Sequence, residues 1–378
     1  MKNILAYLFF LPFATFGQSY DVLFLGNSYT SFNNLPQLVS DIANSMGDTV
    51  NFDSNTPGGA TFNAHSTNAT TLSKISQNEW DFVVLQAQSQ EPSFSPGQVA
   101  NDVYPYAQIL IDSIAQNSSC TEPLFYMTWG RKYGDQQNCV AYPPICSYEG
   151  MQDRLRKSYL EMANTHNASV SPVGIAWKNA MALDSNIELY TTDNSHPSLL
   201  GSYLAACTFY SSIFKKSSVG SSSTAGIDSA TAVFLQTVAS STVLDSLSAW
   251  NIFNADFSNV VNGNTVTMTN TSSNYENLLW DFGDGSQSTD TDPTHIYTAS
   301  GNYTIILTAY NNDDCFIDSS TASIQISIPT GINQSSKEKK SLKHITDLLG
   351  RPTSPAPNQI LLYKYSDGSV EKKIQLDR

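Results

Sequence analysis

The chain has 378 residues, of which 40% are hydrophobic and 11% aromatic, a composition that supports a sizeable folded core and excludes wholesale disorder. Its formal net charge is -14, which argues against nucleic acid and anionic membranes as partners. The charge is uneven, because nine Lys/Arg and five Asp/Glu from Ser335 onward give that tail +4 and leave -18 for the rest.

The first 18 residues predict a secretory signal peptide. One Lys precedes an apolar run that is too short to span a membrane, and small residues lie from Ala14 to Gly17. We expect cleavage close to Gly17-Gln18, and a secreted or cell-surface protein. No later stretch is apolar enough to predict a transmembrane segment.

Five cysteines fit an oxidising compartment. Cys139 and Cys146 flank the loop CVAYPPIC and predict a small disulfide ring. The sequence does not pair Cys120, Cys207 or Cys315. Because the spacings match no zinc pattern, we expect no metal.

Alternating strand and helix patterns predict an α/β domain with a mostly parallel sheet over residues 19–250. Apolar runs predict strands at 22–25, 50–52, 82–85, 124–129, 170–175 and 187–190. Helical periodicity predicts helices at 35–46, 99–114, 151–162, 197–214 and 227–247. The Ser/Gly-rich segment 216–226 is expected to be a surface loop.

The sequence pattern changes after residue 250. Short alternating runs separated by Asn, Gly, Asp and Ser turns predict a small antiparallel β-sandwich over 251–329. Residues 330–378 form a Lys-rich tail with a Pro-containing linker. It ends in two short alternating pieces, with Asp367-Gly368 as a hairpin turn.

Ser28 is the candidate nucleophile. The buried run at 22–25 stops at Gly26 and is followed directly by Asn27 and Ser28. In an open parallel sheet, ligands bind beyond the carboxyl ends of such strands. The alternative is a serine that merely begins the next helix.

His196 and Asp193 are the candidate base and its orienting acid. They form an Asp-x-x-His pattern in a loop before a predicted helix. A carboxylate three residues before a histidine can hold one ring nitrogen and fix the tautomer. The alternative is a helix-capping aspartate with an exposed histidine.

Together these segments resemble the SGNH hydrolase superfamily, the GDSL esterases and lipases. The turn GNSY at 26–29 matches the nucleophile block, with Asn27 in place of the usual acid, and the Asp-x-x-His pattern matches the last block. The resemblance covers about Tyr20 to Leu247. It implies a three-layer, flavodoxin-like α/β fold, a Ser28, His196 and Asp193 triad, and no cofactor.

This sequence matches the family's oxyanion-hole residues less closely than its nucleophile and Asp-x-x-His blocks. The backbone N–H of Ser28 and a glycine, Gly59 or else Gly58, fit two of its donors. The usual Asn of the third block is missing, and LQAQSQ offers glutamine amides instead. We expect Gln86 to fill this place, with Gln88 and Gln90 as alternatives. A further alternative is that no glutamine takes part.

These matches predict a secreted serine esterase that hydrolyses ester bonds, with O-acetyl groups on carbohydrate as the expected target. Its partner would be an acylated small molecule or polysaccharide. The alternative is a catalytically inactive surface protein that binds carbohydrate or mediates adhesion. Asn27 has no chemical role in this scheme, so its substitution is expected to be mild.

The C-terminal parts carry two further resemblances. WDFGDG at 280–285, followed by H-x-Y and G-x-Y, is similar to a PKD domain, an immunoglobulin-like β-sandwich whose Asp/Gly cluster forms a structural turn. Residues 331–378 resemble the sorting domain of type IX secretion substrates. That resemblance implies an extracellular protein and secretion machinery as a partner.

Two other positions near the predicted site stand out. His65 follows the Gly59 loop and is expected to be a solvent-exposed loop residue. Trp129, Gly130 and Arg131 end a strand at the same sheet edge. They either suit a sugar-like ligand or include a Trp that covers the sheet edge.

Overall fold

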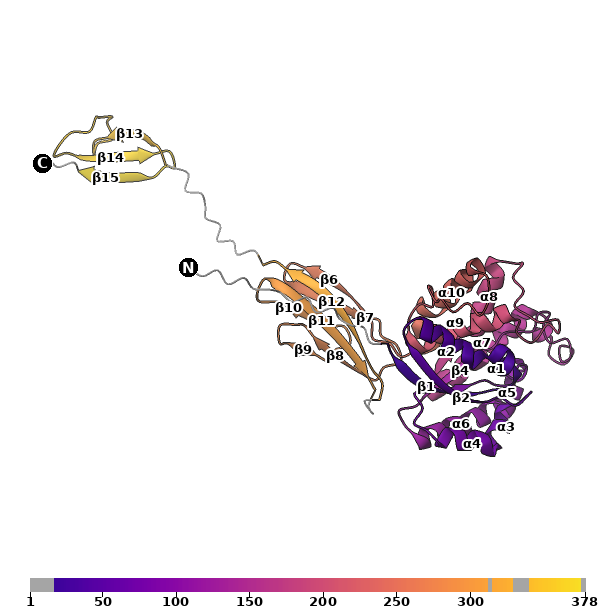
Figure 1. The fold of residues 1–378 in the computed structure, drawn as a ribbon. Helices are drawn as coiled ribbons and strands as arrows, with labels where there is room; N and C mark the ends of the chain where they lie inside the picture. The colour runs from indigo at the N-terminus through magenta and orange to yellow at the C-terminus, as the bar shows by residue number, and fades with distance from the viewer. Residues whose placement is uncertain (1–16, 312–314, 329–339, 375–378) are drawn as a thin grey trace, which may run out of the picture. The chain divides into compact units, whose positions relative to one another are not determined.

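The computed structural model describes residues 17–311, 315–328 and 340–374, so the predicted signal peptide lies almost wholly outside the described residues. The chain divides into two compact units, Met1–Ile326 and Ser327–Arg378. Figure 1 shows the elements of each.

The first unit begins with a five-stranded parallel sheet in the order β2-β1-β3-β4-β5. This is the flavodoxin-like strand order, and it confirms the predicted fold class. The inner strands carry unbroken apolar runs because helices cover both faces of the sheet. The strand bounds are β1 Ser19–Leu25, β2 Thr49–Asn55, β3 Phe82–Leu85, β4 Glu122–Tyr126 and β5 Ser169–Ser171.

Successive residues of β1 face two separate cores. Val22 and Phe24 pack with α2, α8, α9 and α10, whereas Leu23 and Leu25 pack with α3 to α7 (Figure 1). The domain therefore has three layers. The helices are α1 Ser28–Ser31, α2 Leu35–Ser45, α3 Phe62–Thr67, α4 Ala69–Ser76, α5 Pro96–Asp102, α6 Tyr104–Asn117, α7 Tyr148–His166, α8 Val173–Leu183, α9 Leu199–Phe214 and α10 Ser229–Leu244. Short 3-10 helices cover Phe32–Asn34, Glu91–Ser93, Pro143–Cys146 and Leu247–Trp250.

Three sequence predictions within this domain are wrong. The predicted strand at 170–175 ends at Ser171, and α8 begins at Val173, because a short apolar run does not distinguish a strand from a buried helix. The predicted strand at 187–190 is an irregular segment in which Tyr190 forms an isolated bridge with Pro197. The predicted helix at 99–114 is split at Val103, since a proline in the first turn of α6 starts a new helix there.

A two-sheet antiparallel β-sandwich follows, as predicted. One sheet has the order β10-β7-β6 and the other β12-β11-β8-β9. Trp280 is fully buried and donates its indole N–H to the Asp290 carbonyl at 2.9 Å. The strands are β6 Phe257–Asn262, β7 Thr265–Asn270, β8 Asn277–Asp281, β9 Gln287–Ser288, β10 Thr294–Ile296, β11 Gly301–Tyr310 and β12 Ile317–Ile326.

The second unit contains a three-stranded antiparallel sheet in the order β13-β14-β15. Its strands are β13 Leu342–Thr346, β14 Ile360–Tyr365 and β15 Val370–Ile374. Gly368 has a φ of +80° between β14 and β15, which confirms the predicted hairpin turn.

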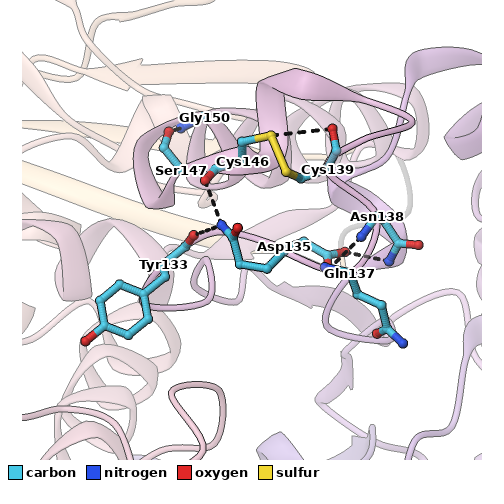
Figure 2. The surroundings of a disulfide bond; sticks show 9 residues. Tyr133, Asp135, Gln137, Asn138, Cys139, Cys146, Ser147 and Gly150 are labelled. Carbon is cyan, nitrogen blue, oxygen red and sulfur yellow. Dashed lines mark hydrogen bonds between the residues drawn. A yellow bond between two sulfur atoms is a disulfide. The ribbon is translucent and has the colours of Figure 1, made fainter.

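Two disulfides are present. Cys139–Cys146 closes the predicted ring (Figure 2), and Cys120 is joined to Cys315, a pairing that the sequence left open. Cys207 is a buried free thiol. Within the described ranges, no helix has the length and apolarity needed to cross a membrane, and no group of three or more His, Cys, Asp or Glu has the arrangement of a metal site.

Candidate active site

The nucleophile candidate sits in a tight turn at the carboxyl end of β1. Ser28 is the first residue of α1, and the Asn27 side chain caps this helix by accepting the Tyr29 N–H at 3.1 Å. A Cβ on Gly26 would come within 2.4 Å of the Thr30 hydroxyl and 2.6 Å of the Gln86 amide oxygen. Glycine is therefore required at position 26, where the strand turns into the segment that carries Ser28.

The structure brings Ser28, His196 and Asp193 together. His196 Nε2 lies 2.8 Å from Ser28 Oγ, and His196 Nδ1 lies 2.5 Å from Asp193 Oδ2. Because the carboxylate only accepts, Nδ1 carries the proton and Nε2 is free to accept the proton of the serine hydroxyl. The His196 side chain is 26% exposed, so the site is open to a ligand.

Asp193 is itself held in place by its other oxygen. Oδ1 accepts the backbone N–H groups of Ser195 and His196, both at 2.9 Å, and the Thr191 hydroxyl at 2.8 Å. Partial burial alone would raise the pKa of Asp193. The hydrogen bonds from His196, Thr191 and Ser195 outweigh burial and hold this pKa well below its ordinary value. Asp193 is therefore a carboxylate at any pH at which His196 acts as a base.

A stack of buried aromatic rings supports the His196 loop from one side. Tyr29, Trp129 and Trp177 stack in series, with ring centroids 4.7 and 3.8 Å apart. The Trp129 indole N–H donates to the Ser195 carbonyl at 3.0 Å, and the Tyr29 hydroxyl lies 2.6 Å from the Ser195 hydroxyl. Because Trp129 is fully buried, it covers the sheet edge and offers no face to a sugar.

The segment after α1 also supports the same loop. The Phe32 ring stacks on His196 with centroids 4.4 Å apart. The Asn33 amide donates to the carbonyls of Pro197 and Ser198 at 3.3 and 3.1 Å. Asn33 has a φ of +53°, a left-handed conformation that Asn adopts more readily than most residues. The Asn-Asn pair at 33–34 is the sequence signal for this support, because both residues have a left-handed φ.

The structure argues against the oxyanion role predicted for Gln86. Its amide oxygen accepts the Asn27 N–H and the Thr30 hydroxyl, both at 2.9 Å. Because a backbone N–H requires an acceptor, this orientation of the amide is fixed. The amide nitrogen then donates to Asn27 Oδ1 at 3.0 Å and to the Ala87 carbonyl. Both amide hydrogens are engaged inside the protein, so none remains for a ligand.

Asn27 is at the centre of this network. It is 2% exposed, and its amide nitrogen also donates to the Ala60 carbonyl at 3.1 Å. The expectation that its substitution would be mild rested on the absence of a chemical role. The structure gives Asn27 a structural role, since its hydrogen bonds connect the nucleophile turn both to Gln86 and to the Gly59 loop.

The other two glutamines differ in what their amides contact. Gln88 Oε1 accepts the N–H groups of Gln90 and Glu91 at 2.7 and 3.2 Å. Within the part of the chain that the structure describes, its amide nitrogen has one hydrogen-bond partner, Gln90 Oε1 at 3.3 Å. Gln90 donates to Asp135 at 2.8 Å. Gln88 lies one residue before Ser89, which is beside the Tyr29 hydroxyl. Gln88 thus has an amide hydrogen to spare in the segment that follows β3, whose last residue is paired with the last residue of β1.

Gly59 lies close to this turn as well. Its φ of +69° is left-handed, and the next residue, Ala60, accepts the hydrogen bond from Asn27. Among the described residues, the backbone N–H groups of Ser28 and Gly59 have no hydrogen-bond partner. Both donors are therefore available to a ligand, whereas Gly58, the alternative, lies one residue farther from this contact.

His65 is not the exposed loop residue that we predicted. It is 1% exposed in α3, and its Nε2 donates to the Gly26 carbonyl at 2.8 Å. Its Nδ1 accepts the Thr71 hydroxyl at 2.8 Å, and that hydroxyl accepts the Asn55 amide at 2.8 Å. The Gly26 N–H in turn donates to the Asn55 carbonyl at 3.1 Å. This ring of hydrogen bonds holds both peptide groups of Gly26, the residue that follows β1.

The buried His65 predicts a pH dependence of stability. Burial lowers its pKa, and the bond to the Gly26 carbonyl only partly offsets that effect. As the pH falls through about 6.5, the unfolded chain binds a proton at His65 that the folded chain excludes, so the free energy of unfolding falls. Between pH 6.5 and 5.5, we expect the wild type to lose up to about 1 kcal/mol more than His65→Gln. Urea unfolding at both pH values measures this, and equal losses in the two proteins would contradict it.

Comparisons with known proteins cover the two domains separately. Residues 253–328 match the model of the PKD domain. Among curated proteins, this chain is similar to the pre-pro-metalloprotease PrtV of Vibrio cholerae, with 37% identity over 86 residues, or 22% of this chain. The match spans only 9% of the length of that protease.

Two solved structures resemble the α/β domain. A DUF4886 family protein from Bacteroides uniformis aligns with a TM-score of 0.51 at 18% identity, over 60% of this chain and 95% of that one. A putative SGNH hydrolase from Slackia heliotrinireducens is 27% identical over 51% of this chain and 97% of that one, with a TM-score of 0.40. The chain thus joins an α/β domain, with the fold of the Bacteroides protein, to a segment that matches the PKD domain.

Proposed function

We propose that this protein is a secreted serine esterase of the SGNH type. The observation that carries the proposal is the hydrogen-bonded series from Ser28 through His196 to Asp193, with distances of 2.8 and 2.5 Å. A hydroxyl, a base and an orienting carboxylate in this arrangement are the parts needed for nucleophilic acyl transfer.

The proposed reaction has two stages. Ser28 Oγ attacks the ester carbonyl while His196 Nε2 takes its proton, and His196 then gives that proton to the departing alcohol. The product of this stage is an acyl-enzyme. Water, deprotonated by the same nitrogen, attacks the acyl-enzyme and releases the acid, which restores Ser28. Asp193 orients the ring and stabilises the imidazolium form in both stages.

The oxyanion formed in each stage needs nearby donors. We assign this role to the backbone N–H groups of Ser28 and Gly59, which have no partner within the described residues. For the third donor we propose the Gln88 amide in place of Gln86, because the hydrogens of Gln86 are already used. Such donors stabilise the transition state because they are oriented before the charge develops.

We extend the proposal to O-acetyl groups on carbohydrate. The extension rests on the resemblance of the nucleophile and Asp-x-x-His blocks to the SGNH esterases, and on the PKD-type segment that follows. The predicted signal peptide and the sorting-domain resemblance of the C-terminal tail support secretion. In this scheme the tail at 330–378 is the part that contacts the secretion machinery.

Acetate release tests the proposal. The full mature chain should release acetate from a small aryl acetate and from at least one acetylated polysaccharide. Circular dichroism before the assay establishes that the protein is folded. Folded protein that binds the polysaccharides but releases no acetate from any substrate would overturn the esterase and favour a carbohydrate-binding or adhesion protein.

A further inference from the structure

Arg131 lies against the His196 loop without a role in the proposed mechanism. Its backbone N–H lies 3.3 Å from the Met151 sulfur. The next residue, Lys132, donates its N–H to the Asn194 carbonyl at 3.0 Å, two residues before His196. The residue before Arg131, Gly130, accepts the Tyr190 hydroxyl at 2.7 Å. The backbone at Arg131 is thus fixed beside the loop that carries the proposed base.

The guanidinium group has donors to spare. Its Nε is buried and has no hydrogen-bond partner among the described residues. Nη1 lies 3.6 Å from Asp135 Oδ1, which is an ion pair but too long for a direct hydrogen bond. The side chain is 26% exposed, so a ligand can reach it.

Asp135 does not use up the hydrogen bonds of Arg131, because its own oxygens are already occupied. Asp135 Oδ2 accepts the side-chain amides of Gln90 and Asn138 at 2.8 and 2.7 Å. Oδ1 accepts the backbone N–H groups of Gln137 and Asn138 at 3.2 and 3.4 Å, as part of the turn in Figure 2. With its carboxylate satisfied by these donors, Asp135 serves as a fixed counter-charge, and the N–H groups of Arg131 stay available.

The loop that carries Asp135 is rigid. The Asp135 N–H donates to the Ile145 carbonyl at 2.8 Å, and the Cys139 N–H donates to the Asp135 carbonyl at 2.9 Å. The Cys139–Cys146 disulfide closes the ring just beyond (Figure 2). The counter-charge that faces the guanidinium is therefore fixed in position before a ligand binds.

Arg131 follows Trp129 by two residues, and Trp129 connects this segment to the nucleophile turn. The Trp129 ring stacks on Tyr29, the residue after Ser28, and its indole N–H donates to the Ser195 carbonyl at 3.0 Å. Tyr29 also contacts Ser195. Because these contacts join the segment of Arg131 to that of Ser28, a group bound at Arg131 is assigned to the same substrate as the ester.

We propose that Arg131 binds a carboxylate of the ester substrate, so that the preferred substrates are esters whose alcohol part carries an acid group. A planar guanidinium with free N–H groups matches a carboxylate in shape and charge. The net negative charge of the protein does not prevent this, because charges beyond about 8 Å are screened at physiological salt. This proposal rests on the proposed esterase function and specifies its substrate.

The test compares acetyl esters that differ only in charge. The probes are 3- and 4-acetoxybenzoate and the corresponding uncharged benzamides, which place the carboxylate at two distances from the ester. A charge-assisted hydrogen bond predicts that Arg131→Met lowers kcat/KM for at least one benzoate by about 10- to 100-fold. Hydrolysis of the benzamides should change by less than about threefold. Arg131→Lys keeps the charge but loses the planar guanidinium and its paired N–H donors, so we expect it to fall between the two.

Lys132→Met is the matched control, because Lys132 is the adjacent cation and already pairs with Glu188 at 2.5 Å. It should leave the ratio of benzoate to benzamide hydrolysis unchanged. Equal losses on benzoates and benzamides in Arg131→Met would mean a structural role and overturn the proposal. So would an unchanged ratio, or a wild type that hydrolyses the benzamides and neither benzoate. If no acetyl ester of any kind is hydrolysed, the proposed esterase function fails instead.

Discussion

The Ser28→Ala variant is expected to hydrolyse acetyl esters at least about 10⁴-fold more slowly than the wild type. Without the hydroxyl there is no nucleophile in contact with His196 Nε2, and only binding and the oxyanion donors remain. The measurement is kcat for a small aryl acetate, after correction for the spontaneous rate.

The matched control is Ser31→Ala. Ser31 lies in the same short helix as Ser28 and is exposed, and it should keep the wild-type rate. Because Ser28 is a surface-accessible side chain at a helix start, its removal should leave the fold intact. Wild-type turnover by Ser28→Ala would show that another residue is the nucleophile.

The Asp193→Asn variant is expected to lose about 10⁴-fold in kcat. Oδ1 accepts two backbone N–H groups and one hydroxyl, so the amide oxygen of Asn must take that place. The amide nitrogen then faces His196 Nδ1 and donates to it. This forces the proton of the ring onto Nε2, which can no longer accept the proton of Ser28. The loss in kcat is expected from the wrong tautomer of His196 alone, without a change in the protein fold.

The control for this prediction is Asp184→Asn, since Asp184 is an exposed carboxylate at the end of α8 that likewise accepts a backbone N–H two residues on, from Asn186 at 2.9 Å. It should keep the wild-type kcat. Nuclear magnetic resonance of the His196 ring gives an independent measure, because the tautomer of Asp193→Asn should differ from that of the wild type. A loss of less than tenfold in kcat with an altered tautomer would contradict the role assigned to Asp193.

The parts of the site that lie within short stretches could be predicted from the sequence. The apolar run at 22–25 followed by Gly26 marks the end of a central strand, and Asp193 and His196 lie on one turn of a loop. Strand alternation with helices places both at the carboxyl edge of a parallel sheet. The order β2-β1-β3-β4-β5 then brings the end of β1 next to the end of β3.

What the sequence could not predict depends on contacts between distant residues. Gln86 and Asn27 are 59 residues apart, and only their contact shows that the Gln86 amide is used internally. The burial of His65 depends on Thr71 and Asn55, which no local pattern links to Gly26. For Trp129, the residue type alone does not distinguish a sugar-binding side chain from one that packs under a loop.

The predicted secondary structure is wrong where a buried helix and a buried strand would contain the same types of residue. Val173 and Ile175 follow β5 closely and are β-branched residues typical of strands, although they already belong to α8. The short segment before Tyr190 has the apolar residues of a strand but no neighbouring strand at that edge of the sheet.

The central claim is that Ser28 is a nucleophile activated by His196, and covalent labelling tests it most directly. The full mature chain is treated with a fluorophosphonate, and the modified residue is identified by peptide mass spectrometry. The account predicts one label per chain, on Ser28, with labelling slowed at least about 10³-fold in His196→Ala. No label, a label on another serine, or labelling of Ser28 at the same rate in His196→Ala would contradict it.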